Sequence, residues 1–219
     1  NFRALEAEVG LCTRFARDPR REVTVVMPIY NGAEFLKKSI DALISFTPAD
    51  VEIILIDDAS SDQEAREILS GYQQSSGVRV VWGRKNVGYT RRVNQGIVLA
   101  SDRDVVLINS DAVVGPGWLY HLKTAAYSSP DIAAVSPVFD DESQFSLGPI
   151  LGTRDQRSVS RALLQRPRFR RLWTAPTIHG ACVYMKRAAI TDVGVMDATR
   201  FPRGYGEEND WSQRAAHRG

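Results

Sequence analysis

The sequence predicts a single α/β domain built on a Rossmann-like, doubly wound and mostly parallel sheet flanked by helices. From residue 22 onward, short segments rich in Val and Ile alternate with longer segments of helical periodicity. This alternation is typical of right-handed strand–helix–strand crossovers. A chain of 219 residues with 43% apolar and 25% charged residues has the size and composition of one globular domain. We therefore expect one domain over residues 21–219.

The expected elements follow from apolar runs and turn residues. Strands are expected at residues 23–27, 51–56, 78–82, 105–108, 132–135 and 181–185. Helices are expected after the first four strands and at 187–193, and a last one begins near Glu208. Ser61 or Asp62 is expected to cap the second helix, and Pro116 lies in the first turn of another. The first helix is expected to have one apolar face that comprises Phe35, Leu36, Ile40, Leu43 and Ile44.

Two stretches fall outside this alternation. Residues 1–20 have a mixed helical pattern and are interpreted as an N-terminal leader or linker. Residues 139–175 have little apolar periodicity and many Arg residues, which is typical of a long functional excursion. Because the sequence stops soon after the last expected helix, we also expect the domain to be truncated at its C-terminus, as a piece of a longer protein would be.

The composition narrows the partners and the location. A net charge of +2 is too small to indicate nucleic acid, and the Arg-rich stretch 154–171 is the only support for it. That stretch is interpreted as a solvated surface or as a contact with phosphates or anionic lipid. No apolar run approaches the ~20 residues that cross a bilayer, and Cys12 and Cys182 cannot form a disulfide framework. We expect a cytoplasmic protein, with peripheral association at the inner face of the membrane.

Acidic and amide side chains follow two of the expected strands. Asp57 and Asp58 come directly after the second strand, and Asn109 and Asp111 follow the fourth. Open α/β sheets bind their ligands at the carboxyl ends of the strands. A carboxylate there can accept hydrogen bonds from a base or ribose, and another can bind Mg²⁺ or Mn²⁺ together with substrate phosphates. A turn rich in Asn, Ser and Asp is the structural alternative.

A third acidic group stands near the end of the sequence. Glu207, Glu208 and Asp210 precede or begin the last expected helix, and Gly204 and Gly206 come just before them. Acidic residues in a first helical turn are favoured by the helix dipole, which is the structural interpretation. In the functional interpretation, adjacent carboxylates raise one another's pKa and one of them acts as a general base. We favour Glu208 for that role.

The ordered combination of motifs resembles the family 2 glycosyltransferases, which have the GT-A fold, and among them the bacterial members that build surface polysaccharides, including rhamnosyltransferase-like enzymes. The resemblance covers residues 22–214. The matching segments are Pro28-Ile-Tyr-Asn31, Ile56-Asp-Asp-Ala-Ser-Ser-Asp62, Asn86-Val-Gly88, Asn94-Gln-Gly96, Asn109-Ser-Asp111, His179-Gly180-Ala and Gly204-Tyr-Gly-Glu-Glu-Asn-Asp-Trp211.

The resemblance implies an inverting transfer of a sugar from a nucleotide-diphosphate donor, linked to UDP, dTDP or GDP, to a hydroxyl of a glycan or lipid-linked acceptor. It implies that Asp111 binds Mn²⁺ or Mg²⁺ and that Glu208 is the base, with Glu207 and Asp210 beside it. Arg91 or Arg92 is a candidate phosphate contact, with exposed helix surface as the favoured alternative. The implied nucleotide contacts are Pro28, Tyr30, Asn31, Asp57, Asp58, Asn86 and Asn109.

The sequence departs from the family pattern at one position of the metal motif, and two alternative functions remain. Asn109 stands where the family often has an Asp, which removes one negative charge from the metal motif. The first alternative is a non-catalytic domain that binds nucleotide-sugar or glycan within a larger synthase. The second is a sugar nucleotidyltransferase, which the lack of a Gly-rich basic loop after the first strand disfavours. The retained carboxylates favour a transferase over a binding domain.

Overall fold

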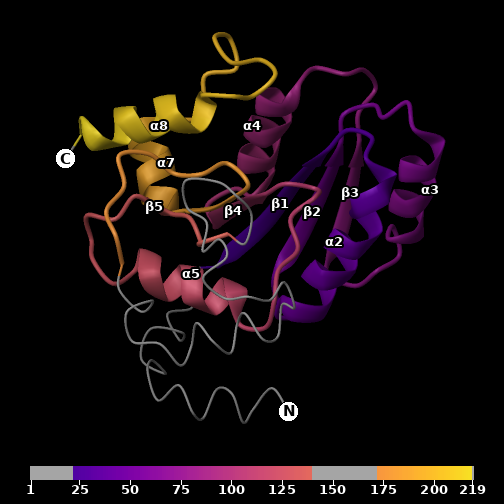
Figure 1. Ribbon diagram of the computed structural model, residues 1–219, viewed down its shortest axis with the longest axis horizontal. Coiled ribbons are helices and arrows are strands. Elements are labelled where there is room, and N and C mark those ends of the chain that lie inside the picture. Colours follow the sequence, from indigo (N-terminus) through magenta and orange to yellow (C-terminus); the bar gives the residue numbers. More distant parts are fainter. Residues whose placement is uncertain (1–21, 140–171, 219) are drawn as a thin grey trace.

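The computed structural model describes residues 22–139 and 172–218, and within them a six-stranded sheet lies between two layers of helices (Figure 1). The strand order is β3-β2-β1-β4-β6-β5. Strands β1 to β4 are parallel, whereas β6 runs antiparallel to β4 and to β5. The strands are β1 (Val23–Ile29), β2 (Glu52–Asp57), β3 (Val78–Trp82), β4 (Asp104–Ile108), β5 (Ala134–Val135) and β6 (Cys182–Met185).

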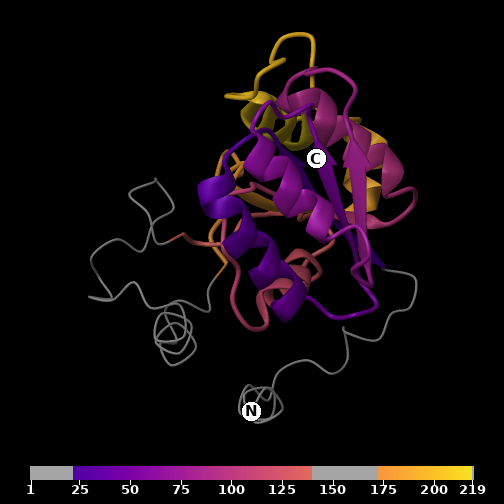
Figure 2. The ribbon, with the colours of Figure 1, turned by 90° about the vertical axis from the view of Figure 1, so that its right-hand side faces the viewer.

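The helices cover both faces of the sheet, as Figure 2 shows from the side. Helices α2, α3 and α5 pack on one face, and α4, α7 and α8 pack on the other. Strand β1 alternates between the two cores, with Met27 in the first and Val26 in the second. The predicted doubly wound, mostly parallel α/β fold is therefore confirmed. The helices are α2 (Ala33–Phe46), α3 (Gln63–Gly71), α4 (Tyr89–Leu99), α5 (Trp118–Ala126), α7 (Arg187–Val193) and α8 (Glu207–Ala216).

Several local predictions need correction. The side chains of Phe35 and Ile44 are 50% and 37% exposed, because the buried stripe of α2 runs along a narrower row and leaves them at its margins. Strand β1 continues through Pro28, which is buried. The strand expected at 132–135 is only two residues long, and it lies outside β6 at the edge of the sheet. The leader at 1–20 and most of the 139–175 excursion fall outside the described residues.

Of the two predicted helix starts, the one at Asp62 is confirmed and the one at Pro116 is not. Asp62 caps α3, because its carboxylate accepts hydrogen bonds from the N–H groups of Glu64 and Ala65. Helix α5 begins at Trp118, after a Gly117 in the left-handed region, rather than at Pro116.

Among the helices of residues 22–139 and 172–218, none is both long and apolar enough to cross a membrane.

Helix α4 packs closely on the sheet through a glycine. A Cβ added at Gly96 would lie 2.2 Å from Cγ1 of Val26 in β1. We expect Gly96→Ala to lower the free energy of unfolding by about 1–3 kcal/mol, because the helix must move away from β1 to accept the methyl group. Gly71→Ala is the control, since nothing lies within 4 Å of its added Cβ. Urea denaturation measures both, and equal stabilities would contradict the close packing.

Candidate active site

Asn31 joins the first two loops at the carboxyl end of the sheet. It adopts a left-handed conformation with φ of 58°, which Asn tolerates better than most residues. Its side-chain Oδ1 accepts hydrogen bonds from the N–H groups of Ser61 (2.9 Å) and Asp62 (3.0 Å), and its own N–H donates to Ser60 Oγ. The predicted nucleotide contact therefore has its carboxamide oxygen engaged within the protein. The neighbouring Tyr30 is half exposed above it.

Asp57 and Asp58 are both buried. Asp57 accepts a hydrogen bond from the N–H of Ser60, which closes the turn after β2. The Asp58 carboxylate accepts one bond each from the N–H groups of Val87 and Gly88, both at 2.8 Å. Asp58 therefore fixes the loop that leads into α4. Of these predicted nucleotide contacts, Tyr30 offers exposed surface, whereas Pro28, Asp57 and Asp58 are buried.

The buried Asp58 carboxylate pairs with Arg92, and the sequence does not reveal this contact. Its side chain is buried, which corrects the favoured expectation of an exposed helix-surface arginine. Its Nε donates to Asp58 Oδ1 at 2.7 Å, and its two Nη atoms donate to Gln95 and to the carbonyl of Lys85. The sequence signal is weak, because one-residue differences in helix phase decide whether Arg91 or Arg92 faces the sheet.

Asn109 and Tyr89 connect the end of β4 to the start of α4. The N–H of Asn109 donates to the carbonyl of Ala181 in the neighbouring chain segment. Its side-chain Oδ1 accepts a hydrogen bond from the Tyr89 hydroxyl at 3.0 Å. Asp111, two residues further on, is exposed, and no other described side chain or N–H group is bonded to it. Asp111 is thus free to bind a ligand, while Asn109 positions the turn.

The segment before α8 holds its carboxylates with an unusual backbone. Gly204, Tyr205 and Gly206 have φ values of 88°, 65° and 123°, so three consecutive residues lie at positive φ. The N–H of Gly206 donates to Glu208 Oε2 at 3.1 Å. Glu207 is buried, and its Oε2 has no hydrogen-bond partner in the described part of the chain. Glu208 is only half-buried, so its carboxylate can reach a ligand.

Carboxylates from two distant segments converge on Tyr89. Burial raises the pKa of the Tyr89 hydroxyl, and the negative charges of Glu207, Glu208 and Asp111 raise it further, in that order. A Cβ added at Gly204 would lie 3.4 Å from Tyr89 Cδ1 and 3.6 Å from both Glu207 carboxylate oxygens, so Glu207 lies close to the Tyr89 ring. Since that hydroxyl also contacts Asn109, the structure brings together the predicted metal motif and the predicted base. This convergence defines the candidate active site.

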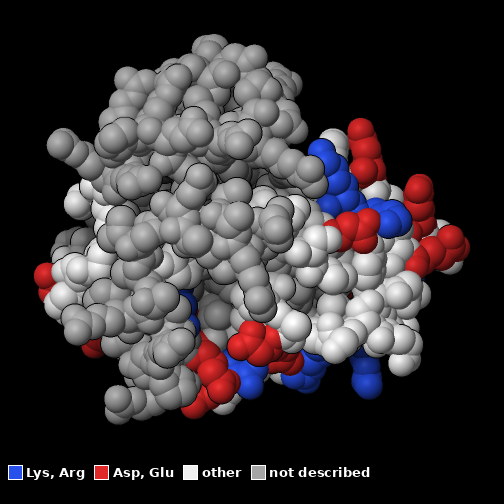
Figure 3. All heavy atoms as spheres, turned by 90° about the horizontal axis from the view of Figure 1, so that it is seen from below, with Lys and Arg blue, Asp and Glu red and all other residues white. Residues whose placement is uncertain are grey.

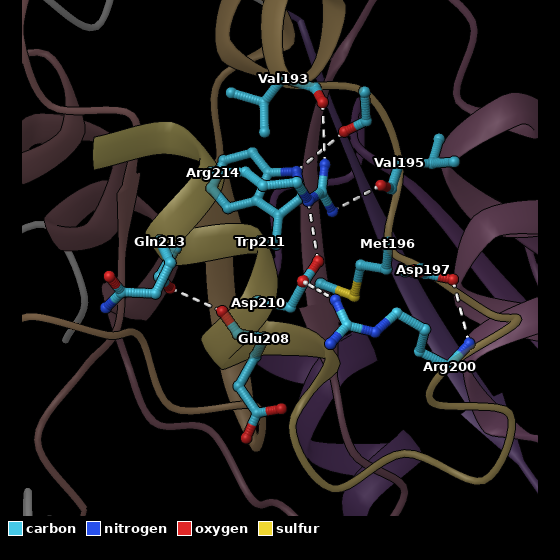
Figure 4. Close-up of polar contacts among 12 residues, drawn as sticks. Val193, Val195, Met196, Asp197, Arg200, Glu208, Asp210, Trp211, Gln213 and Arg214 are labelled. Atoms are coloured by element: carbon cyan, nitrogen blue, oxygen red, sulfur yellow. Dashed lines mark hydrogen bonds and ion pairs between the residues drawn. The ribbon is translucent and has the colours of Figure 1, made fainter. Parts of the chain in front are cut away.

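Asp210 is not part of this group. Its carboxylate pairs with Arg214 Nε at 2.8 Å and with Arg200 Nη1 at 3.5 Å. Arg214 also donates to the carbonyls of Val193 and Val195, so the pair ties α8 to the segment after α7 (Figure 4). In Figure 4 the Glu208 side chain extends from the helix in a different direction. Sequence proximity grouped Asp210 with the two glutamates, but the helical rotation separates them.

The Glu208 side chain packs beside a glycine. A Cβ added at Gly180 would lie 3.6 Å from Glu208 Cδ, so the carboxylate rests against this glycine. The adjacent His179 packs on Phe139, with ring centroids 4.6 Å apart, and its Nδ1 accepts a hydrogen bond from the N–H of Ala181. These contacts give His179 a structural role in the segment that leads into β6. In the sequence, the adjacent pair His179-Gly180 is the only sign of the contact between Gly180 and the Glu208 carboxylate.

The last predicted nucleotide contact, Asn86, lies on a cleft beside the loop that Asp58 fixes. It is exposed in the wall of a hollow of about 660 Å³ formed by residues 85–88, Arg91, Pro202 and Arg203. A Cβ added at Gly88 would lie 2.1 Å from the carbonyl oxygen of Pro202, so the two walls touch there. We call this hollow the basic cleft.

A metal at this site would depend on Asp111. Among the described residues, no three His, Cys, Asp or Glu side chains are placed to hold an ion together. Mg²⁺ and Mn²⁺ commonly bind through one or two carboxylates plus substrate phosphates and waters. The exposed, unpartnered Asp111 fits that mode of binding, in which the substrate completes the coordination.

Glu207 predicts a pH dependence of stability. Burial, and then the charge of Glu208, raises its pKa from 4.5 to about 7. The folded protein thus keeps a proton that the unfolded chain releases, so the free energy of unfolding falls as pH rises from 4.5 to about 7. We expect Glu207→Gln to remove about 1–3 kcal/mol of this decline. Urea denaturation across that range measures it. Glu34→Gln, an exposed control, should keep the decline, and an unchanged Glu207→Gln profile would contradict the assignment.

Comparison with solved structures shows the same fold in two proteins that were solved with a nucleotide and Mn²⁺. A mannosyltransferase, PcManGT from Pyrobaculum calidifontis in complex with GDP-Man and Mn²⁺, aligns with a TM-score of 0.61 at 20% identity. The alignment covers 96% of this chain and 56% of that one. GalNAc-T7 with UDP, GalNAc and Mn²⁺ aligns with a TM-score of 0.66 at 16% identity, over 90% of this chain and 41% of that one.

Sequence comparison gives the family. Glycosyltransferase GlyG from Streptococcus pneumoniae is 30% identical over 92 residues, which are 42% of this chain and 31% of that protein. Poly-beta-1,6-N-acetyl-D-glucosamine synthase from Staphylococcus epidermidis is 25% identical over 175 residues, or 80% of this chain. The chain spans only 42% of that synthase. The model of glycosyl transferase family 2 matches residues 24–194. The chain therefore belongs to glycosyl transferase family 2.

Proposed function

We propose that this chain is the donor-binding and catalytic part of a metal-dependent, inverting glycosyltransferase. It would move a sugar from a nucleotide-diphosphate donor to a hydroxyl of a glycan or lipid-linked acceptor. The observation that carries this proposal is that Tyr89 links the two motifs: its hydroxyl donates to Asn109 at 3.0 Å, and its ring and the Glu207 carboxylate both lie against Gly204. A metal-binding carboxylate and a base carboxylate at one centre are the two groups that such a transfer requires.

In the proposed reaction, Glu208 takes the proton of the acceptor hydroxyl. Its Oε2 accepts a hydrogen bond from the N–H of Gly206, which orients the carboxylate. The acceptor oxygen then forms a bond to the anomeric carbon while the bond from that carbon to the diphosphate oxygen breaks. A single displacement from the opposite side inverts the configuration. A positioned base typically contributes ~10²–10⁴-fold to such a step.

Asp111 would hold Mn²⁺ or Mg²⁺ together with the donor diphosphate. A bound divalent ion supplies charge stabilisation for a diphosphate leaving group. The loops fixed by Asn31 and Asp58 would form the wall for the nucleotide, with Tyr30 as the exposed aromatic surface. Pro28, Asp57 and Asn109 would support those walls from inside.

The relatives support the substrate class of the proposal. Two fold neighbours were solved with Mn²⁺ and with GDP-Man or UDP, and one sequence relative is a polysaccharide synthase. We extend the proposal to synthesis of bacterial surface glycan on the cytoplasmic side, with the protein at the inner face of the membrane. The domain would span residues 21–219, with 1–20 as a leader.

Calorimetric titration tests this function. UDP, dTDP, GDP and CMP are each titrated with Mn²⁺ and again with a chelator. We expect one diphosphate to bind, and we expect its affinity to fall at least about tenfold with the chelator and in Asp111→Ala, because Asp111 would hold the ion that supplies positive charge to the phosphates. Asp50→Ala, an exposed aspartate in the turn before β2, is the control. Binding that is equally tight with the chelator would contradict the metal-dependent site.

A further inference from the structure

Tyr205 presents an exposed aromatic ring in the turn before α8. Its side chain is 96% exposed, more than any other large hydrophobic side chain that the structure describes. Among the described residues, no group forms a hydrogen bond or a ring contact with it. By contrast, charged side chains of both signs are interspersed on the described surface that Figure 3 shows from below. A ligand that covered the Tyr205 ring would remove apolar surface from water without breaking a described contact.

The backbone of Tyr205 is strained. Its φ of 65° lies in the left-handed region, where a bulky residue is rare because Cβ approaches the following carbonyl oxygen. A Gly or Asn would adopt this conformation at lower cost. The turn therefore holds an aromatic side chain at a position where the backbone favours a small one. Strain of this kind is concentrated at ligand-binding sites, which indicates a role for the ring itself.

The turn that carries the ring is held on both sides. The Thr90 hydroxyl in α4 donates to the carbonyl of Phe201, and the N–H of Gly204 donates to the same carbonyl. A Cβ added at Gly206 would lie 2.9 Å from Cε1 of Phe201, so the Phe201 ring packs against the turn. The backbone is thus fixed while the Tyr205 ring stays exposed, and a ligand would need to order little besides the ring.

Tyr205 adjoins the proposed base. The N–H of Gly206 is joined directly to the carbonyl carbon of Tyr205, and it donates to Glu208 Oε2 at 3.1 Å. One peptide bond therefore separates Tyr205 from the group that orients the base. Pro202 and Arg203, which line the basic cleft, come earlier in the same loop. A ligand whose hydroxyl meets Glu208 would lie next to Tyr205.

The polar surroundings of the ring favour a carbohydrate ligand. Glu207 and Glu208 follow the turn, and Arg203 precedes it. A long apolar chain would find no further apolar residue between Arg203 and Glu208, and an anion would be repelled by the Glu208 carboxylate. A pyranose ring suits both features, because its C–H groups form an apolar face and its hydroxyls can donate to a carboxylate.

We propose that the Tyr205 ring stacks on a sugar ring of the acceptor, the sugar whose hydroxyl meets Glu208. This inference rests on the proposed function, because it names the acceptor class of the same centre: a carbohydrate, free or lipid-linked, rather than a plain lipid alcohol. Tyr205 would bind and orient the acceptor and would take no part in proton transfer. Its aromatic face, not its hydroxyl, makes the contact.

Two substitutions separate the ring from the backbone. Tyr205→Phe keeps the aromatic face and the strained backbone. Tyr205→Asn removes the ring but suits the left-handed conformation, so we expect it to be at least as stable as the wild type in urea denaturation. Phe35→Ala, which removes a half-exposed ring from α2, is the control for loss of an exposed aromatic side chain.

The probes are three simple glycosides. Saturation-transfer NMR titrations use methyl β-D-glucopyranoside, methyl β-D-galactopyranoside and methyl α-L-rhamnopyranoside, with sorbitol as a linear polyol that has no ring. We expect wild-type protein to bind at least one glycoside more tightly than sorbitol. Tyr205→Asn should lose at least about fivefold in that affinity, because the stacked aromatic contact is gone. Tyr205→Phe and Phe35→Ala should stay within about twofold of wild type.

The donor side is measured in parallel. Calorimetry with the diphosphate that binds in the presence of Mn²⁺ should give affinities within about twofold for all of these variants. Failure of the proposed function is distinguishable from failure of this inference. In the former case wild-type protein shows no metal-dependent diphosphate binding, whereas the glycoside affinities of the variants decide the latter.

Four results would overturn the inference. In the first, wild-type protein binds no glycoside, or binds sorbitol as tightly. In the second, Tyr205→Asn keeps the glycoside affinity. In the third, Tyr205→Phe loses as much as Tyr205→Asn, which would assign the contact to the phenol hydroxyl. In the fourth, Tyr205→Asn loses diphosphate affinity as well, which would place the ring on the donor.

Discussion

Replacement of Glu208 by Gln is expected to lower sugar transfer by ~10²–10⁴-fold, because the amide cannot take the proton of the acceptor hydroxyl. The same change should leave diphosphate affinity within about twofold, since Glu208 faces the acceptor in the proposed geometry. Nucleotide release from the donor in the presence of acceptor measures the first quantity, and calorimetry measures the second. Glu64→Gln, an exposed glutamate on α3, is the control for a generic loss of charge.

A comparison with the neighbouring Glu207 tests the assignment of Glu208 as the general base. It is buried and its pKa is raised to about 7, so its neutral form is already well populated near neutral pH and Gln imitates that form. We therefore expect Glu207→Gln to reduce transfer less than Glu208→Gln. The opposite ranking would assign the base to Glu207, and wild-type transfer by Glu208→Gln would remove the proposed role of Glu208.

Arg92→Ala is expected to lower the free energy of unfolding by about 3–5 kcal/mol, because it leaves the buried Asp58 carboxylate without its partner. The two side chains are only 10% and 5% exposed and lie 2.7 Å apart. Urea denaturation provides the measurement. Arg91→Ala is the matched control one residue earlier on α4, where the side chain is exposed, and we expect a change within about 0.5 kcal/mol. Similar losses in both variants would contradict a specific role for the buried pair.

Much of the fold could be predicted because the sequence patterns are local. Continuous apolar runs mark β1, β2 and β4, which are buried on both faces, and Asp62 marks the start of α3. The order of the last two strands could not be predicted in this way. β6 inserts between β4 and β5 in the antiparallel direction, and that placement depends on long-range packing rather than on any local motif.

The sequence indicates which polar residues lie at the candidate site, but not whether each side chain faces a ligand or an internal partner. Residues after parallel strands meet at one edge, so the positions of Asp58 and Asp111 follow from the fold. Whether a carboxylate faces a ligand or an internal partner depends on helix phase and loop path. Helix phase and loop path decide that Asp58 pairs with Arg92. They also decide that Asp210 pairs with Arg214, one turn further along α8. Tyr89, which links the two halves of the site, carries no signal of its own in the sequence.

The most direct measurement is a crystal structure of the chain with Mn²⁺ and a non-transferable analogue of the donor that binds in calorimetry. Anomalous scattering locates the ion, and the electron density locates the anomeric carbon. The account predicts Mn²⁺ on the Asp111 carboxylate and the donor diphosphate, with the Glu208 carboxylate on the side of the anomeric carbon opposite the leaving oxygen. An ion bound elsewhere, or a donor whose anomeric carbon faces away from Glu208, would contradict it.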